Sequence, residues 1–319
     1  MTAATQILML SVDEGALLER SLPAAAAQPG AEVVVVDNAC ADGTAAVAAA
    51  HGARLVRLGE RVSYAAAINR GLAACDAPAV LLLNADCVLA GGFLAAARPH
   101  LDADPSLGSV APRLVRSTGV GPDDRLDLID AAGMVVDRRR KNALVGHGAP
   151  AGAYARGGEA FGGDGACVLY RRATLEDCAV GGEVLDEDMA LWASDADLAW
   201  RARLLGWGCR YEPAALAWHK RFYSPSTRAA LDEEHRRLQF RNRLLMLAKN
   251  ETAAGLLRDL PWIAGYEALA LGHVLLRERH LLAGYRDAWR LLPRARARRR
   301  VIQRRRAPGR VPFGLAPAP

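Results

Sequence analysis

The chain has 319 residues, 51% of them hydrophobic, which excludes a disordered protein and predicts one large domain or one domain with an appendage. The net charge is +6, but residues 293–319 contain nine arginines and no acidic residue, so the rest of the chain carries −3 and the basic character belongs to the C-terminus. The six cysteines are scattered and form no C-x-x-C pair, which predicts reduced thiols in a cytosolic protein without a signal peptide.

Short apolar segments alternate with helical segments in the first third of the chain. The pattern predicts strands at residues 6–10, 33–36, 54–58 and 79–83, and helices at residues 15–27, 44–50 and 65–74. The four consecutive valines at 33–36 are typical of a strand that is buried on both faces. This alternation predicts a mainly parallel sheet with helices on its faces.

After residue 106 the alternation of apolar and helical segments is less regular. Residues 117–158 are rich in Gly, Asp and Arg, and they predict a long insertion that contributes to a binding site. The later apolar and charged patterns predict strands at 110–115, 166–172, 208–211 and 214–219, and helices at 195–205, 231–249, 256–276 and 280–292.

Three strand-like segments end in residues that can bind a ligand or a metal. Asp37 follows the valine run, Asp86 follows the run at 81–84, and His219 ends the last strand-like segment. Open α/β sheets bind their ligands at the carboxyl ends of the strands. We therefore expect these three residues to lie in one site.

Seven motifs resemble those of family 2 glycosyltransferases of the GT-A fold, close to the bacterial rhamnosyltransferase-like branch. They occur in the family's order over about residues 5–250, and the order makes the resemblance specific. The motifs are VVVVDNACADGT (33–44), YAAAINRGL (64–72), LLLNADCVL (81–89), GGDGACVLYRR (162–172), DEDMALWASDADLAWRARLLGWG (186–208), EPAALAWH (212–219) and RNRLLMLAKN (241–250).

The resemblance implies a GT-A fold, a Rossmann-like α/β domain with a mainly parallel sheet, followed by a helical C-terminal extension. We predict the catalytic domain at residues 1–225, with the insertion at about 117–158. A helical region is predicted at 226–292 and a flexible basic tail at 293–319.

The resemblance also implies that Asp37, Asn69, Gly71, Asn84 and Asp164 bind the nucleotide sugar. An acidic acceptor such as Asp37 can take the imide N–H of uracil or thymine, although Asp37 can also be explained by an Asx turn. The family's glycines before Asn69 are absent here. Asp164 stands in a glycine-rich turn that can approach a ligand closely, and a plain turn is the alternative.

Asp86 and His219 are the metal ligands that the resemblance implies. The run 84–86 stands where the family has its D-x-D motif, with Asn in the first position. Mg²⁺ or Mn²⁺ suits such a site, because these ions take oxygen ligands and keep substrate phosphates in their shell. The alternatives are a solvated carboxylate at a strand end and a histidine of the core.

Asp195 is the candidate general base that deprotonates the acceptor hydroxyl in an inverting transfer without a covalent intermediate. The family has Glu where this chain has Ser194, which can alter the base. The alternative is a capping box from Ser194 to Asp197, which would make Asp195 an ordinary acid of the first helical turn. Trp192 can stack on the acceptor, or it can be a buried aromatic residue.

The C-terminal third predicts a peripheral membrane contact. The helix at 256–276 is long enough to span a bilayer, but Arg258, Asp259 and Glu267 argue against spanning. An amphipathic helix on the surface, with arginines of 294–310 near an anionic leaflet, explains the pattern better. No nucleic-acid partner is expected, because no such motif accompanies the arginines. A dimerisation arm is a further alternative.

The resemblance implies an inverting, metal-dependent glycosyltransferase at the inner face of the cell membrane. The first choice is transfer of L-rhamnose from dTDP-rhamnose to a hydroxyl of a lipid-linked or polysaccharide acceptor in cell-envelope glycan synthesis. A UDP- or GDP-hexose donor and a non-catalytic scaffold that binds sugar nucleotides are the alternatives. A dinucleotide-dependent oxidoreductase would need a G-x-G-x-x-G turn after the first strand, and residues 11–15 read SVDEG instead.

Overall fold

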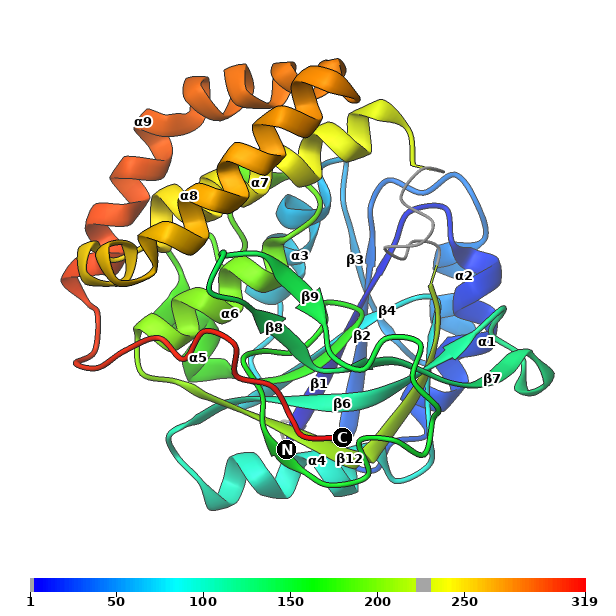
Figure 1. The fold of residues 1–319 in the computed structure, drawn as a ribbon. Coiled ribbons are helices and arrows are strands. Elements are labelled where there is room, and N and C mark those ends of the chain that lie inside the picture. Colours follow the sequence, from blue (N-terminus) through cyan, green and yellow to red (C-terminus); the bar gives the residue numbers. More distant parts are fainter. Residues whose placement is uncertain (1–2, 222–230) are drawn as a thin grey trace.

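The structure, a computed structural model, describes residues 3–221 and 231–319 (Figure 1). Its central sheet has the strand order β10-β12-β6-β11-β4-β1-β2-β3, with β5 paired to β12 and β7 paired to β6. The strands are β1 (Thr5–Ser11), β2 (Ala31–Asp37), β3 (Arg54–Arg57), β4 (Ala79–Asn84), β5 (Cys87–Leu89), β6 (Leu107–Ser117), β7 (Arg125–Ala132), β10 (Gly158–Glu159), β11 (Cys167–Arg171) and β12 (Gly208–Lys220).

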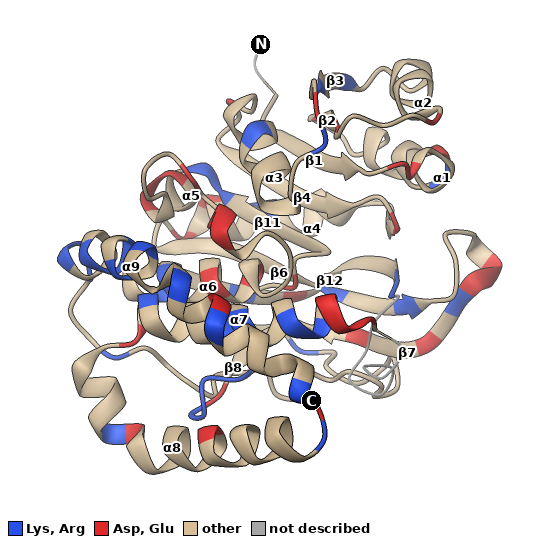
Figure 2. Ribbon diagram, turned by 90° about the horizontal axis from the view of Figure 1, so that it is seen from above, with Lys and Arg blue, Asp and Glu red and all other residues tan. Residues whose placement is uncertain are grey.

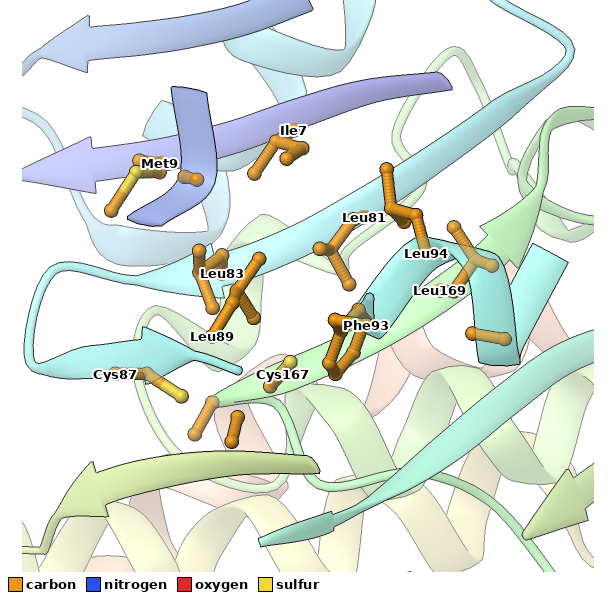
Figure 3. Close-up of a cluster of buried hydrophobic side chains, with 14 of the residues drawn as sticks. Ile7, Met9, Leu81, Leu83, Cys87, Leu89, Phe93, Leu94, Cys167 and Leu169 are labelled. Atoms are coloured by element: carbon orange, nitrogen blue, oxygen red, sulfur yellow. The ribbon is translucent and has the colours of Figure 1, made fainter. Parts of the chain in front are cut away.

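Helices cover both faces of this sheet, as the alternation of strands and helices predicts. One face carries α1 (Gly15–Ala26), α2 (Thr44–Ala50) and α4 (Phe93–Ala103), and the other carries α3 (Tyr64–Ala73), α5 (Arg172–Cys178) and α6 (Ser194–Leu204). Successive residues of a strand point to opposite faces, so Ile7 and Met9 enter one core while Leu8 and Leu10 enter the other. Figure 3 shows the first core, a cluster that includes side chains of β1 and β4 and Phe93 of α4.

The predicted insertion at 117–158 contains regular structure. Strand β7 pairs antiparallel with β6 and widens the sheet, and β8 (Met134–Val136) pairs with β9 (Asn142–Leu144) in a separate ribbon. The two strands predicted at 208–211 and 214–219 are one strand, β12, whose pairing with β6 shifts register between Glu212 and Leu216. The extra residues of that irregularity explain why the apolar pattern is interrupted there.

Three helices follow the sheet and lie together on one side of it: α7 (Glu233–Asn250), α8 (Ala253–Leu276) and α9 (Leu282–Arg304) (Figure 1). The domain boundary predicted at residue 225 lies outside the described residues. In the part of the chain that is described, no helix combines the length and the apolar character that crossing a membrane requires.

The tail that the sequence predicts to be flexible from residue 293 is helical at its start. Helix α9 continues past that residue to Arg304. Beyond the helix, the Phe313 ring stacks on Phe161 and meets Trp200 edge to face, with ring centroids 6.0 and 5.0 Å apart. Burial of these aromatic surfaces outweighs the repulsion among the arginines, so the segment is packed against the domain.

Candidate functional site

The polar residues predicted at the strand ends gather at one edge of the sheet. Strands β1, β2, β3 and β4 are mutually parallel, and β11 runs antiparallel to both β4 and β6, so β6 and its parallel partner β12 point the same way as β4. Asp37 and Asn84 therefore end their strands at the edge where β12 ends with His219 and Lys220. Asp164 precedes the antiparallel strand β11 and so lies at the same edge.

Asp86 and His219 are brought together by backbone pairing. Strand β5 pairs with β12 so that Cys87 is opposite His219, and the Lys220 amide donates to the carbonyl oxygen of Asp86 at 3.0 Å. The His219 Nε2 atom lies 3.4 Å from Asp86 Oδ1, and both side chains are buried. The chain thus confirms that these two predicted residues are neighbours, while their role as ligands stays a prediction.

Asp130 of β7 is a member of this cluster that the sequence did not reveal. It is fully buried, and its Oδ2 atom lies 2.8 Å from His219 Nδ1 while its Oδ1 atom accepts from Arg221 Nε at 2.6 Å. Burial favours the neutral histidine ring, but the hydrogen bond to Asp130 and the negative charges of Asp86 and Asp130 outweigh it and raise the pKa of His219 to about 10. Burial works against ionisation of Asp130 too, yet His219 and Arg221 lower its pKa to about 2.

The Asp86 and His219 pair fits a divalent cation. Asp86 Oδ1 is buried and accepts no hydrogen bond from the described residues, and such a buried oxygen needs a partner. Two ligands about 2.1 Å from one ion lie about 3 Å apart, close to the separation of Asp86 Oδ1 and His219 Nε2. Because Asp130 holds Nδ1, Nε2 is the nitrogen that faces Asp86, and binding there releases its proton.

Asp195 lies at the start of α6 against the glycine-rich turn that carries Asp164. Its Oδ2 atom accepts from the Gly165 amide at 3.1 Å, and its Oδ1 atom accepts from the Ala196 amide at 2.8 Å. A Cβ atom at Gly165 would lie 3.3 Å from the Asp195 Cβ, so the close approach favours glycine. Burial and the negative charge of Asp164 raise the pKa of Asp195, although the two amides and Arg221 oppose the change. A carboxylate of raised pKa is a better general base.

The capping box predicted from Ser194 to Asp197 is wrong. The N-cap is Ala193, in a left-handed conformation, and the buried Ser194 hydroxyl has no hydrogen-bond partner in residues 3–221 and 231–319. Asp197 is buried and accepts from Arg201 Nε at 3.1 Å, and the Lys249 Nζ lies 3.0 Å from it. Buried carboxylates require such partners, so Asp197 belongs to an ion-pair network between α6 and α7.

Asp37 closes a local turn, but its bond reaches the amide three residues along the chain and not two, as in the Asx turn that was the alternative explanation. Its Oδ1 atom accepts from the Cys40 amide at 2.7 Å, and its Oδ2 atom accepts from Arg57 Nε at 3.1 Å. A carboxylate oxygen can accept a second hydrogen bond. The contact between Asp37 and a nucleotide base therefore stays a prediction that this turn accommodates.

Asn69 and Gly71 of α3 make their contacts within the protein in this structure. The Asn69 amide donates to the Leu185 carbonyl at 2.8 Å and accepts from the Leu185 amide at 2.9 Å. A Cβ atom at Gly71 would lie 2.6 Å from Val36 and 2.8 Å from Leu8. The glycine thus allows α3 to pack closely on the sheet, and the sequence pattern that suggested a donor contact has this structural explanation.

Two aromatic residues lie at the same edge. The Trp192 ring precedes Asp195 and meets the His235 ring edge to face at 6.0 Å. Burial and the negative charges of Asp195, Asp164 and Asp86 raise the pKa of Tyr64 well above its usual range, which puts the phenol near all three carboxylates. Tyr64 stands inside a quoted motif, but its aromatic character alone gave no signal for this position.

A second group of possible ligand atoms lies in the loops after β1 and β2. Atoms of Asp13, Cys40 and Asp42 lie within 4.8 Å of one another. These groups are engaged by their own loops: the Gly15 amide donates to Asp42, and Arg61 pairs with Asp13. The loop contacts account for the grouping, so the metal candidate remains the buried pair of Asp86 and His219.

Comparison with known proteins shows which family the chain belongs to. The model of glycosyl transferase family 2 matches residues 6–178. An uncharacterized glycosyltransferase of Mycobacterium bovis is 41% identical over 86 residues, which are 26% of this chain and 39% of the relative. The pre-mycofactocin glycosyltransferase of Mycobacterium tuberculosis is 32% identical over 157 residues, 49% of this chain and 29% of the relative. The chain thus spans less than half the length of these curated relatives.

Solved structures show similarity along almost the whole chain. The mannosyltransferase PcManGT from Pyrobaculum calidifontis, in complex with GDP-Man and Mn²⁺, has a TM-score of 0.52 and 20% identity, covering 94% of this chain and 87% of that one. Residues 1–349 of S. aureus TarS in complex with UDP-GlcNAc give a TM-score of 0.57 and 15% identity, covering 95% and 90%. These likenesses confirm the expected GT-A fold with its helical C-terminal region.

Proposed function

The chain belongs to glycosyl transferase family 2, and on this premise we propose that it transfers a sugar from a nucleotide sugar to a hydroxyl group of an acceptor. One observation carries the proposal: a candidate metal pair and a candidate base lie in one cluster of charged residues. Asp86 neighbours His219, which is bonded to Asp130, and Arg221 joins Asp130 to Asp164. Asp195 lies beside that last carboxylate.

The proposed reaction is a single inverting displacement. The acceptor hydroxyl gives its proton to Asp195 while its oxygen forms a bond to the anomeric carbon, and the bond from that carbon to the diphosphate oxygen breaks. Mg²⁺ or Mn²⁺, when held by Asp86 and His219, supplies Lewis-acid stabilisation of the leaving diphosphate. Asp130 holds the His219 ring in place. The raised pKa of Asp195 supports its role as the proton acceptor.

The donor that we propose first is dTDP-L-rhamnose, with a UDP- or GDP-hexose as the alternative. The first choice follows the motifs that resemble the rhamnosyltransferase-like branch. Two structural relatives were solved with GDP-Man and UDP-GlcNAc, which supports a nucleotide-sugar donor of some kind. Asp37, Asn84 and Asp164 are the proposed donor contacts, whereas Asn69 and Gly71 would act indirectly by shaping α3.

The acceptor that we propose is a lipid-linked saccharide or polysaccharide of the cell envelope, reached at the inner face of the membrane. Support comes from α8, where Leu257, Trp262 and Leu269 are 74%, 53% and 77% exposed. Figure 2 shows few charges on α8 and a row of basic residues along α9 on the same side of the molecule. Exposed apolar groups beside arginines suit the interface of an anionic leaflet.

Slow hydrolysis of the donor tests the proposed reaction without knowledge of the acceptor. Purified protein is incubated with dTDP-, UDP- and GDP-sugars, with and without Mn²⁺, and nucleoside diphosphate release is measured. We expect metal-dependent release from one donor, lost in Asp86→Ala. It should persist in Asp102→Ala, which changes an exposed carboxylate of α4. Nucleoside diphosphate release that depends neither on the metal nor on Asp86 would contradict the proposed site.

A scaffold that binds a sugar nucleotide without turnover is the competing function. The buried and unbonded Ser194 hydroxyl motivates it, because the resembling family has a carboxylate at that position. The same assay separates the two functions when calorimetric binding is measured beside it. Tight binding of one nucleotide sugar with no turnover, even after lipid-linked acceptors are added, would favour the scaffold.

A further inference from the structure

A strained turn leads into the helix that carries Asp195. Ala190 has φ 60° and ψ −68°, and the Leu191 amide donates to the Met189 carbonyl at 2.7 Å. These values describe the rare form of γ-turn, which is strained for any residue other than glycine. Trp192 and Ala193 follow with φ of 71° and 57°. Three left-handed residues thus occur within four positions, none of them a glycine.

Strain of this kind persists only when the surroundings enforce it. Glycine would adopt these angles at little cost, but this chain has Ala190, Trp192 and Ala193 instead. The conformation must therefore be held from outside the turn. Its position is informative, because the turn contains the candidate acceptor contact and ends two residues before the candidate base.

The groups that hold the turn come from α7. Asn242 is fully buried, and its Nδ2 atom lies 2.7, 2.6 and 3.0 Å from the carbonyl oxygens of Met189, Leu191 and Trp192. Its Oδ1 atom accepts from Arg241 Nε at 2.9 Å. That bond fixes which end of the amide faces the turn.

Arg241 adds to the same contact with its other nitrogens. Its Nη2 atom donates to the Asp188 carbonyl at 2.8 Å and to the Met189 carbonyl at 3.2 Å. Burial lowers the pKa of Arg241 from its usual value, and the nearby Asp188 is among the charges that oppose this. Its guanidinium is therefore occupied by contacts within the protein.

We propose that Arg241 and Asn242 are positioning residues, which hold the turn at 189–193 in its strained form and so set the directions of Trp192 and Asp195. Neither would touch the substrate. The inference rests on the proposed role of Asp195 as the base. It gives α7, which lies outside the family match at 6–178, a part in the same reaction.

The first variant is Asn242→Ala, with Gln239→Ala as its matched control. Gln239 is a half-buried amide residue on the same helix. We expect Asn242→Ala to lower kcat for donor hydrolysis about 100-fold, as displacement of a catalytic group by about 1 Å can do, with the KM for the donor changed little. Amide hydrogen exchange at residues 190–195 should become faster in that variant alone.

A second substitution separates loss of the turn from general damage. Ala190→Gly reduces the cost of the left-handed conformation, so the double variant Asn242→Ala with Ala190→Gly should recover several-fold of the lost kcat and part of the exchange protection. A variant that had merely lost stability would keep its kcat at a temperature where it is folded, so it would have no loss of kcat for the glycine to recover.

The results that would overturn this inference differ from those that would overturn the proposed function. An Asn242→Ala protein with wild-type kcat and wild-type exchange at 190–195 would overturn the inference, as would a double variant that is worse than the single one. If the wild-type protein releases no nucleoside diphosphate from any donor, the proposed function fails. Faster exchange in Asn242→Ala would then show that Asn242 holds the turn at 189–193, but it would overturn the role of that turn in catalysis.

Discussion

One arginine, whose side chain is 13% exposed, joins the two parts of the candidate site. Arg221 donates to Asp130 at 2.6 Å and to Asp164 at 2.7 Å. Asp130 orients His219, and Asp164 lies beside Asp195. Two buried carboxylates without a cation would be costly, so Arg221 allows the metal side and the base side to lie close together.

Asp130→Asn tests the orientation of His219. Asparagine keeps the size of the side chain but loses the charge, and its amide cannot satisfy both His219 and Arg221. We expect affinity for Mn²⁺ to fall about 10- to 100-fold, as is usual when the partner of a ligating histidine is changed. Titration of Mn²⁺ into the protein, followed by electron paramagnetic resonance, measures this without turnover. Asp127→Asn, an exposed change on the same strand, is the control, and equal affinities in the two variants would refute the role.

Asp164→Asn tests the electrostatics of the base. The charge of Asp164 raises the pKa of Asp195, and Asp195 must be ionised to accept a proton, so kcat falls as pH drops through that pKa. Removing the charge lowers the pKa, and the acid limb of the kcat profile should move to lower pH at saturating donor. Asp102→Asn should leave the limb in place. A limb that moves to higher pH would exclude Asp195 as the group that titrates.

The sequence predicts those site residues that stand at the ends of recognisable elements. Asp86 and His219 follow apolar runs, and Asp195 begins a helix, so local patterns locate them. Asp130 lies in a segment that reads as a loose insertion, and its role depends on the pairing of β7 with β6 and on the return of β12. Contacts made by such long-range pairing leave no local pattern.

The apolar contact surface of helix α9 is hard to recognise in the sequence, because the helix is rich in arginine. Three of its four buried residues, Ala288, Ala295 and Ile302, recur at intervals of seven, and Leu281 of the preceding turn lies one interval before them. This spacing marks one face of a helix, but small residues among many arginines resemble a solvated tail. By contrast, the four valines of β2 could be read directly, because every one of them is buried.

Phe313→Ala tests whether the segment after α9 is fixed to the domain. The ring lies against Phe161 and Trp200, and the Arg140 guanidinium carbon is 3.6 Å from its centroid. Loss of a buried Phe costs about 3–5 kcal/mol, and this ring is half-buried, so we expect a loss of about 2 kcal/mol in the free energy of unfolding. Urea denaturation measures it. Val301→Ala, on the exposed side of α9, should cost no more than about 0.5 kcal/mol. Equal losses in the free energy of unfolding of the two variants would support the flexible tail instead.

The distribution of charge over the protein separates the donor side from the C-terminal side. The described site residues at the strand ends include the carboxylates of Asp86, Asp130, Asp164 and Asp195, whereas α9 is rich in basic residues (Figure 2). Trp289 is 75% exposed between Arg286 and Arg290, on the outer side of α9. An aromatic ring among cations is typical of groups that lie at the level of lipid head groups.

Binding to vesicles tests this side of the protein. Wild-type protein should sediment with phosphatidylglycerol vesicles and far less with phosphatidylcholine, and added salt should weaken the binding because it screens surface charge. Each arginine near an anionic surface contributes about 1 kcal/mol, so Arg290→Gln and Arg300→Gln should each weaken binding about fivefold. Arg20→Gln, an exposed change on α1, should have no effect.

A change in the apolar helix tests the other half of the contact. Leu257→Glu with Leu269→Glu puts charges on the exposed face of α8, and burying either in the interface would cost more than the leucine gained. We expect vesicle binding to be lost while the donor is hydrolysed at the wild-type rate, because none of the described site residues lies on α8. Unchanged vesicle binding would contradict the contact. A wild-type protein that is dimeric by light scattering, and becomes monomeric with these substitutions, would assign the exposed leucines to a second copy of the chain instead.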